Sequence, residues 1–176
     1  MLLASDNIQM TGNIVSDPST KESLGKAIGR LASGVFIVTL KQDADKHGVM
    51  ATWVNQAAFE PPSITAAFNK ERHFLQFLDK DVLFTVNVLS NKNMDIFKAF
   101  ARPGKENDDR FDGLELVEGT TAGPVFAKAV AYLNCQVRQI IDAGDHMLSL
   151  ATVVGGDVLH PDLEPMTHVR KNGFQY

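Results

Sequence analysis

Residues 129–154 read AVAYLNCQVRQIIDAGDHMLSLATVV, and the two apolar runs in this stretch decide the expected fold. The runs meet at residues 143–145 (AGD), a short and polar connection with a glycine at its centre. A tight Gly-Asp connection between two apolar runs is typical of a β-hairpin. The sequence therefore predicts two long antiparallel strands, over residues 129–142 and 146–154.

The rest of the chain adds shorter strands and a few helices. β-Branched and aromatic residues predict strands, whereas apolar residues spaced three and four apart predict amphipathic helices. The predicted strands are residues 35–40, 49–54, 63–68 and 82–89, with a polar turn at 43–48. The predicted helices run from Pro18 to a stop at Gly34, over 73–78 and over 91–101, and residues 102–110 form a loop. Because βαβ alternation is missing, the expected fold class is mainly β, a closed antiparallel barrel with short helices outside.

The totals for the chain limit its organisation and location. With 176 residues, the sequence predicts one domain over residues 19–176, preceded by an extended arm over residues 1–18. A net charge of −4 leaves no dense basic face, so nucleic acid is not an expected partner. Cys135 is the only cysteine, no secretory signal is evident, and no stretch approaches the roughly 18 apolar residues that cross a bilayer. We therefore expect a cytoplasmic protein with no membrane contact.

Several common catalytic motifs are missing from the sequence. The five histidines are scattered with no HxxxH pair, so no metal site is expected. No GxGxxG, Walker A or GxSxG motif is present. Two polar residues in predicted strands have a structural explanation. We expect Cys135 to be a buried, inert thiol and Asn87 to be a core amide with satisfied hydrogen bonds.

An uncharged polar stretch around the only tryptophan is the main candidate for a binding site. Residues 52–56 read TWVNQ and precede Pro61 and Pro62. Neutral Thr, Asn and Gln side chains suit the edge of a flat heteroaromatic ligand, although a proline-terminated loop of ordinary turn residues explains the same composition. Further on, Lys70 and Arg72 suit a phosphate, because the lysine ammonium supplies a point charge and the guanidinium can donate two parallel hydrogen bonds. The alternative is that both are solvated residues at the start of a helix.

Six segments carry a resemblance to a known family. They are GVFIVT (34–39), HGVMATWVNQAAFEPPSI (47–64), VLFTVNVL (82–89), DRFDGL (109–114), AYLNCQV (131–137) and AGDHMLSLATVV (143–154). In this order they resemble the flavin reductase-like family of FMN-binding split barrels, which are Greek-key antiparallel barrels. The segments GRLASGVFIVT, WVNQAAFEPP and NKER look more like the flavin reductase module at the C-terminus of cyanobacterial flavodiiron proteins. Many stand-alone reductases carry Ser and Thr where Arg72 and Phe74 stand here, and a serine where Ala58 stands.

The resemblance implies an activity, its cofactors and an assembly. It implies NAD(P)H:flavin oxidoreduction, with hydride passing from NADH or NADPH to FMN, and FAD is less expected. It also implies a homodimer with FMN at the subunit interface. Cofactor contacts fall to Thr52, Trp53, Val54, Asn55, Gln56, Lys70, Arg72, Arg110 and Phe111. The resemblance gives His146 a catalytic role, orienting the nicotinamide or stabilising the reduced flavin, whereas a plain hairpin residue bonded to Asp145 is the alternative.

Two other functions stay open on the sequence. One is a non-enzymatic FMN electron carrier of the flavoredoxin type, which receives its electrons from a redox protein partner. The other is a split barrel that binds no flavin and has a structural or ligand-sensing role.

Overall fold

The computed structural model describes residues 17–101 and 109–175, and these form two compact units. The smaller unit holds residues 17–32 and 169–175, and the larger unit comes from residues 33–168. Each unit has its own hydrogen-bonded structure and is described separately below.

Three expectations about organisation concern residues that are only partly described. Nearly all of the predicted arm over residues 1–18 and most of the predicted loop over residues 102–110 lie outside the described residues. These two predictions, and the single domain over residues 19–176, stay predictions. Within the described ranges, no helix has the length and apolar character needed to cross a membrane.

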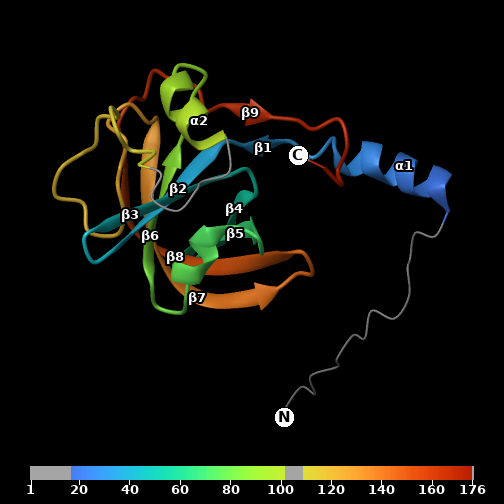
Figure 1. The fold of residues 1–176 in the computed structure, drawn as a ribbon, viewed down its shortest axis with the longest axis horizontal. Coiled ribbons are helices and arrows are strands. Elements are labelled where there is room, and N and C mark those ends of the chain that lie inside the picture. Colours follow the sequence, from blue (N-terminus) through green and yellow to red (C-terminus); the bar gives the residue numbers. More distant parts are fainter. Residues whose placement is uncertain (1–16, 102–108, 176) are drawn as a thin grey trace, which may run out of the picture. The chain divides into compact units, whose positions relative to one another are not determined.

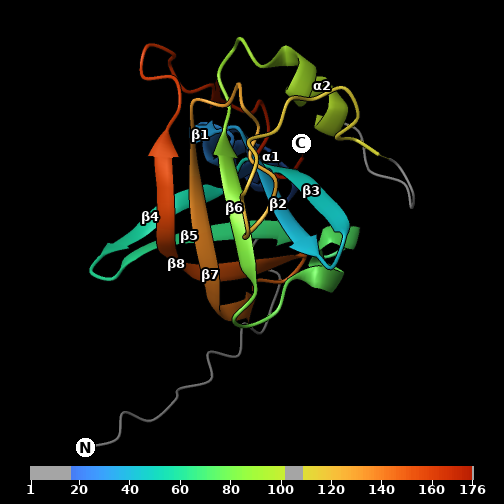
Figure 2. The same cartoon turned by 90° about the vertical axis from the view of Figure 1, so that its left-hand side faces the viewer.

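A seven-stranded antiparallel sheet forms the larger unit, in the order β3-β2-β6-β7-β8-β5-β4. The strands are β2 Phe36–Gln42, β3 Asp45–Ala51, β4 Val54–Phe59, β5 Pro62–Asn69, β6 Leu83–Val88, β7 Ala131–Asp142 and β8 His146–Val158. Strands β2 and β6 run across the direction of β4 and β5, so the sheet curls around a core (Figures 1 and 2). The predicted mainly β, antiparallel fold is confirmed, and β7 and β8 form the predicted hairpin.

Short helices of the larger unit lie within predicted spans. They are the 3-10 helix η1 His73–Phe77 and the α-helix α2 Met94–Ala101. The helix predicted over residues 91–101 starts later than expected. The reason is a turn in which Oδ1 of Asn93 accepts a hydrogen bond from the N–H of Ser90 at 2.8 Å.

Helix α1, Pro18–Ile28, belongs to the smaller unit and begins as predicted. The side chain of Asp17 caps it by accepting a hydrogen bond from a first-turn N–H at 2.9 Å. The predicted stop at Gly34 is wrong, because β1, Ser33–Gly34, is already a strand that pairs with β9, Thr167–His168.

The bounds predicted for the strand over residues 49–54 are wrong. Strand β3 begins four residues earlier and ends at Ala51. Asp43 adopts a left-handed conformation, with φ of +53°, and this closes a tight two-residue turn between β2 and β3. The polar turn predicted over residues 43–48 therefore shortens, and the residues after it join the sheet.

Pro61 and Pro62 lie in a hairpin instead of ending a binding loop. Strands β4 and β5 pair with Phe59 opposite Pro62, which is the first residue of β5, a position where proline is tolerated. The predicted loop over residues 52–56 is therefore only partly a loop. Its first two residues link β3 to β4, and the other three belong to β4.

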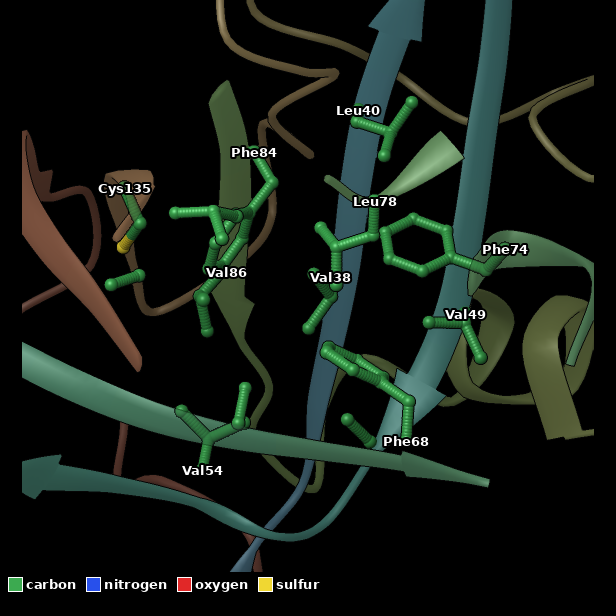
Figure 3. Packing of buried hydrophobic residues seen from close by; sticks show 14 of the residues in the cluster. Val38, Leu40, Val49, Val54, Phe68, Phe74, Leu78, Phe84, Val86 and Cys135 are labelled. Carbon is green, nitrogen blue, oxygen red and sulfur yellow. The ribbon is translucent and has the colours of Figure 1, made fainter. Parts of the chain in front are cut away.

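Two hydrophobic clusters stabilise the larger unit. The first cluster fills the curled sheet (Figure 3), and the second joins β2 to α2. Cys135 belongs to the first cluster and is fully buried, and burial raises the pKa of its thiol to about 12. The prediction of a buried thiol is confirmed.

A group of buried hydrogen bonds, here called the Asn87 network, ties the segment before β7 to the sheet. Nδ2 of Asn87 donates to the carbonyl oxygens of Ile37 and Pro124, both at 3.2 Å, and its Oδ1 accepts from the N–H of Phe126 at 3.0 Å. The hydroxyl of Thr39 donates to the carbonyl oxygen of Pro124 at 2.6 Å. The prediction that Asn87 is a satisfied core amide is confirmed.

In the smaller unit the C-terminal segment packs on α1. The N–H of Arg170 donates to the carbonyl oxygen of Gly29 at 3.1 Å, and that of Gly173 donates to the carbonyl oxygen of Gly25 at 2.7 Å. A Cβ atom on Gly29 would lie 2.8 Å from the carbonyl oxygen of Arg170. The close approach of the two segments therefore requires glycine.

Candidate functional site

The turn between β7 and β8 presents the candidate site. Gly144 has φ of +96°, a conformation that favours glycine. Its N–H donates to Oδ1 of Asp142 at 2.9 Å. The N–H of Lys70 donates to the carbonyl oxygen of Asp145 at 3.0 Å, so the end of β5 is bonded to this turn. These bonds fix the conformation of the turn and thereby the position of the next residue, His146.

The buried ring of His146 joins the turn to the only tryptophan. The rings of His146 and Trp53 lie 4.7 Å apart between centroids, with their planes at 39°. Nδ1 of His146 is 2.8 Å from Oδ1 of Asp145, and this hydrogen bond is the main reason why the pKa of the Asp145 carboxyl lies below its usual range. The carbonyl oxygen of Trp53 accepts from the N–H of Ala67 on β5 at 3.0 Å. The structure thus brings together two residues that the sequence predicted separately.

Two buried hydroxyl groups have no hydrogen-bond partner among the residues that the structure describes. They belong to Thr52, directly before Trp53, and to Ser149 on β8. Ser149 lies opposite Ala66, a member of the first hydrophobic cluster. A buried hydroxyl without a partner costs about 1–3 kcal/mol, so such a group calls for an explanation, for example a ligand.

The three predicted contact residues on β4 have different surroundings. Val54 is buried in the first hydrophobic cluster, so packing already accounts for its side chain. Asn55 and Gln56 are exposed on β4, which is the edge strand of the sheet. A register shift follows Gln56, whose amide makes a long hydrogen bond of 3.5 Å to the carbonyl oxygen of Ala58. Asn55 and Gln56 therefore offer side-chain amides to a ligand.

The two predicted phosphate-binding residues lie near the β7–β8 turn and at the start of η1. Nζ of Lys70 is 2.8 Å from both carboxylate oxygens of Asp142, and this pair lowers the pKa of the Asp142 carboxyl. Arg72 is half-buried at the N-cap position of η1, and its N–H donates to the carbonyl oxygen of Asn69 at 3.0 Å. Lys70 therefore already contacts an anion within the chain.

Arg110 and Phe111 lie with the second hydrophobic cluster. The guanidinium carbon of Arg110 is 5.6 Å from the ring centroid of Phe100. Phe111 is buried, in edge contact with Phe100 at 5.3 Å and stacked on Phe126 at 5.9 Å. Packing around α2 accounts for both side chains, and their predicted cofactor contacts stay predictions.

Sequence reasoning missed Asp142 and Ser149. The sequence shows an acid at the start of the predicted hairpin connection, but it does not show that the neighbouring strand would bring Lys70 to it. Ser149 gave no signal, since one serine in an apolar strand is common. Across residues 17–101 and 109–175, no group of three or more His, Cys, Asp or Glu side chains is placed to hold a metal ion.

Solved structures of flavin reductases share this fold. The NADH:FAD oxidoreductase SgcE6 of Streptomyces globisporus matches with a TM-score of 0.77 and 26% identity, covering 90% of this chain and 93% of that one. The flavin reductase PheA2 matches with a TM-score of 0.70 and 23% identity, covering 82% and 90%. The predicted split barrel of the flavin reductase class is thereby confirmed.

Sequence comparison identifies the family. Residues 28–175 match the flavin reductase like domain, so the chain belongs to this family. A diflavin flavoprotein A of Nostoc sp. is 36% identical over 162 residues, which are 92% of this chain and 28% of the relative. Diflavin flavoprotein A 1 of Synechocystis sp. is 31% identical over 97% of this chain and 30% of the relative. The predicted family resemblance is confirmed, and the chain spans less than a third of the length of these relatives.

Proposed function

We propose that the protein is a cytoplasmic flavin reductase that transfers hydride from NADH or NADPH to FMN. The observation that carries the proposal is the buried hydroxyl of Thr52, which has no partner among the described residues and lies next to the Trp53–His146 contact. In a chain of the flavin reductase family, a flavin is the ligand that best explains this arrangement.

The chemistry of these residues fits a flavin. The hydroxyl of Thr52 and the amides of Asn55 and Gln56 are neutral donors and acceptors, and these suit the carbonyl-bearing edge of the ring because a buried, unpaired charge would be costly. A bound flavin supplies the ring that accepts the hydride, and the protein supplies binding and orientation. Trp53 and the backbone of Val54 complete the proposed wall of the site.

His146 is the proposed catalytic residue. Its Nδ1 is held by the carboxylate of Asp145, so the ring has a defined orientation. We place it against the nicotinamide or the reduced ring, where an imidazole can stabilise developing negative charge. His146→Ala should slow reduction by NADH or NADPH more than it weakens flavin binding, and equal effects on both would leave His146 only a structural role.

We assign the flavin phosphate to Lys70 and Arg72. The Lys70–Asp142 pair is partly exposed, and the ammonium of Lys70 has three donors, so Lys70 can bond a phosphate while it keeps its contact with Asp142. Replacing both cations by alanine should weaken FMN binding by about 2–4 kcal/mol, measured by fluorescence titration. Unchanged affinity would remove the assignment. For Arg110 and Phe111 we retain the proposed cofactor contact, and an Arg110→Ala variant with unchanged FMN affinity would remove it for that residue.

A homodimer with the flavin at the subunit interface is part of the proposal. Large apolar side chains are exposed in the larger unit: Phe59 is 87% exposed, Val154 55% and Val158 57%. The pairing of β8 with β5 stops at Thr152, so the last residues of β8 pair only with β7. Apolar surface beside an open strand edge is what a second copy would cover. Light scattering that gives the mass of one chain would contradict the dimer.

The deciding experiment is a visible absorption spectrum of the purified protein with added FMN or FAD, followed by addition of NADH or NADPH. We expect FMN fluorescence to be quenched on binding and the flavin band to bleach with catalytic turnover. A protein that quenches neither flavin would refute the proposal.

A second function, an FMN electron carrier of the flavoredoxin type, is favoured by one observation. The related diflavin flavoproteins are more than three times longer than this chain, so in them the module is joined to other regions. A carrier receives its electrons from a redox protein. Bound flavin without steady-state NADH or NADPH oxidation in excess FMN would identify the carrier.

A further inference from the structure

Lys70 contacts both ends of the β7–β8 turn. Its N–H donates to the carbonyl oxygen of Asp145 at 3.0 Å, and its Nζ reaches both carboxylate oxygens of Asp142 at 2.8 Å. One of these oxygens also accepts from the N–H of Gly144 at 2.9 Å. An isolated surface ion pair contributes little, but this one is linked to two backbone bonds of the same turn. The turn is therefore held by the bond between Asp142 and Gly144 within it and by the bonds of Lys70, which follows β5.

The same turn carries the Asp145–His146 pair. The Asp145 side chain is 84% exposed, whereas that of His146 is only 6% exposed, and Oδ1 of Asp145 is 2.8 Å from Nδ1 of His146. A carboxylate at this distance favours the proton on Nδ1 and fixes the rotation of the ring. The ring held in this way is the one that packs on Trp53.

We infer that Asp145 is a positioning residue: it holds His146 against Trp53 with the proton on Nδ1, and the Lys70–Asp142 pair fixes the turn that carries them both. This inference rests on the proposed function, in which His146 contacts the reacting rings. Both carboxylates are ionised at neutral pH, as an ordinary aspartate is, and their hydrogen bonds lower the pKa values of Asp142 and Asp145 further. In this arrangement the exposed carboxylate of Asp145 sets the orientation of the buried His146 ring.

The only tryptophan of the chain gives a direct readout without any flavin. Emission and acrylamide quenching of Trp53 are measured in the protein without flavin for the wild type, Asp145→Ala, Asp145→Asn and His146→Ala. We expect Asp145→Ala to move both signals most of the way to those of His146→Ala. Asp145→Asn keeps an acceptor oxygen and should stay near the wild type. Glu71→Gln, which removes an exposed charge beside Lys70, is the control and should change neither signal.

Kinetics then connect this geometry to the reaction. We expect Asp145→Ala to lower kcat with NADH about tenfold, as loss of a group that orients a histidine does, with a much smaller change in FMN affinity and in melting temperature. Asp142→Asn should shift the Trp53 signals in the same direction by a smaller amount. Asp145→Asn should recover most of the lost rate.

Two results would overturn the inference. One is wild-type emission and quenching in Asp145→Ala. The other, which needs no variant, is a nitrogen NMR spectrum of the wild-type protein that places the proton of neutral His146 on Nε2. Because both are measured without flavin, they are separate from the proposed function. A changed Trp53 signal in a protein that reduces no flavin would retain the positioning role and refute the reductase.

Discussion

The Asn87 network and the surroundings of Thr52 both place polar side chains within one curled sheet, but the two regions satisfy these groups differently. In the Asn87 network, the amide and the nearby Thr39 hydroxyl make hydrogen bonds of 2.6–3.2 Å to the backbone. Around the β3–β4 connection, the buried hydroxyl of Thr52 has no such partner among the described residues. The polar groups of the Asn87 network thus find their partners within the chain, and we propose that the partner of the Thr52 hydroxyl is a ligand.

The strongest test of this contrast is removal of the Asn87 amide. Asn87→Ala leaves the N–H of Phe126 and a carbonyl oxygen of the sheet without their partner and opens a small cavity. The free energy of unfolding should fall by about 3 kcal/mol, measured by urea denaturation. FMN affinity should remain that of the wild type, and a loss of affinity without a loss of stability would reverse the assignment of the two regions.

The same substitution made in both regions gives a sharper comparison. Thr39→Val should lower the free energy of unfolding by about 1–2 kcal/mol, because the carbonyl oxygen of Pro124 loses a buried donor. Thr52→Val should leave stability unchanged or raise it by up to about 1 kcal/mol, and it should weaken FMN binding about five- to tenfold. Urea denaturation and FMN titration of the two variants measure both quantities. Equal stability losses would show that Thr52 has a partner in the folded chain.

Cys135 tests whether every weakly bonded buried group needs a ligand. Its only described contact as a donor is a long one, 3.8 Å to the carbonyl oxygen of Leu133, and burial raises its pKa from 9.0 to about 12. Between these pH values the unfolded chain loses the thiol proton and the folded chain keeps it. The free energy of unfolding should therefore fall with rising pH, by about 1.4 kcal/mol per pH unit. Cys135→Val is the control, since the part of the slope due to the thiol should disappear in it.

The smallest effect is expected at Ser149, the other hydroxyl without a described partner. It lies opposite Ala66, which in turn pairs with Val54, and both of these residues belong to the first hydrophobic cluster. Ser149→Ala should therefore raise the free energy of unfolding by less than about 1 kcal/mol and leave FMN affinity unchanged. If affinity falls as in Thr52→Val, Ser149 belongs to the site as well.

The sequence predicted the parts of this molecule that depend on local pattern. The β7–β8 hairpin, the cap of α1 and the roles of Asn87 and Cys135 follow from alternation, turn chemistry and the cost of burying polar atoms. The bounds of β3 and β4 could not be predicted from residue propensities. The left-handed conformation of Asp43 shortens the turn before β3, and Pro62 begins β5, so the strands include residues that the sequence assigned to turns and loops. The Lys70–Asp142 contact was not predicted, since it depends on which strands become neighbours.

Lys70 and Asp142 are separated by 72 positions in the chain, and the bonds around them join β5 to the β7–β8 turn. Chains dominated by such distant pairings fold slowly. The entropy of closing long loops is lost before the contacts that stabilise the closed chain can form. During synthesis, the proposed site cannot form until the β7–β8 turn has left the ribosome after β5. A cofactor would thus act by mass action on the finished barrel and would not guide the nascent chain towards it.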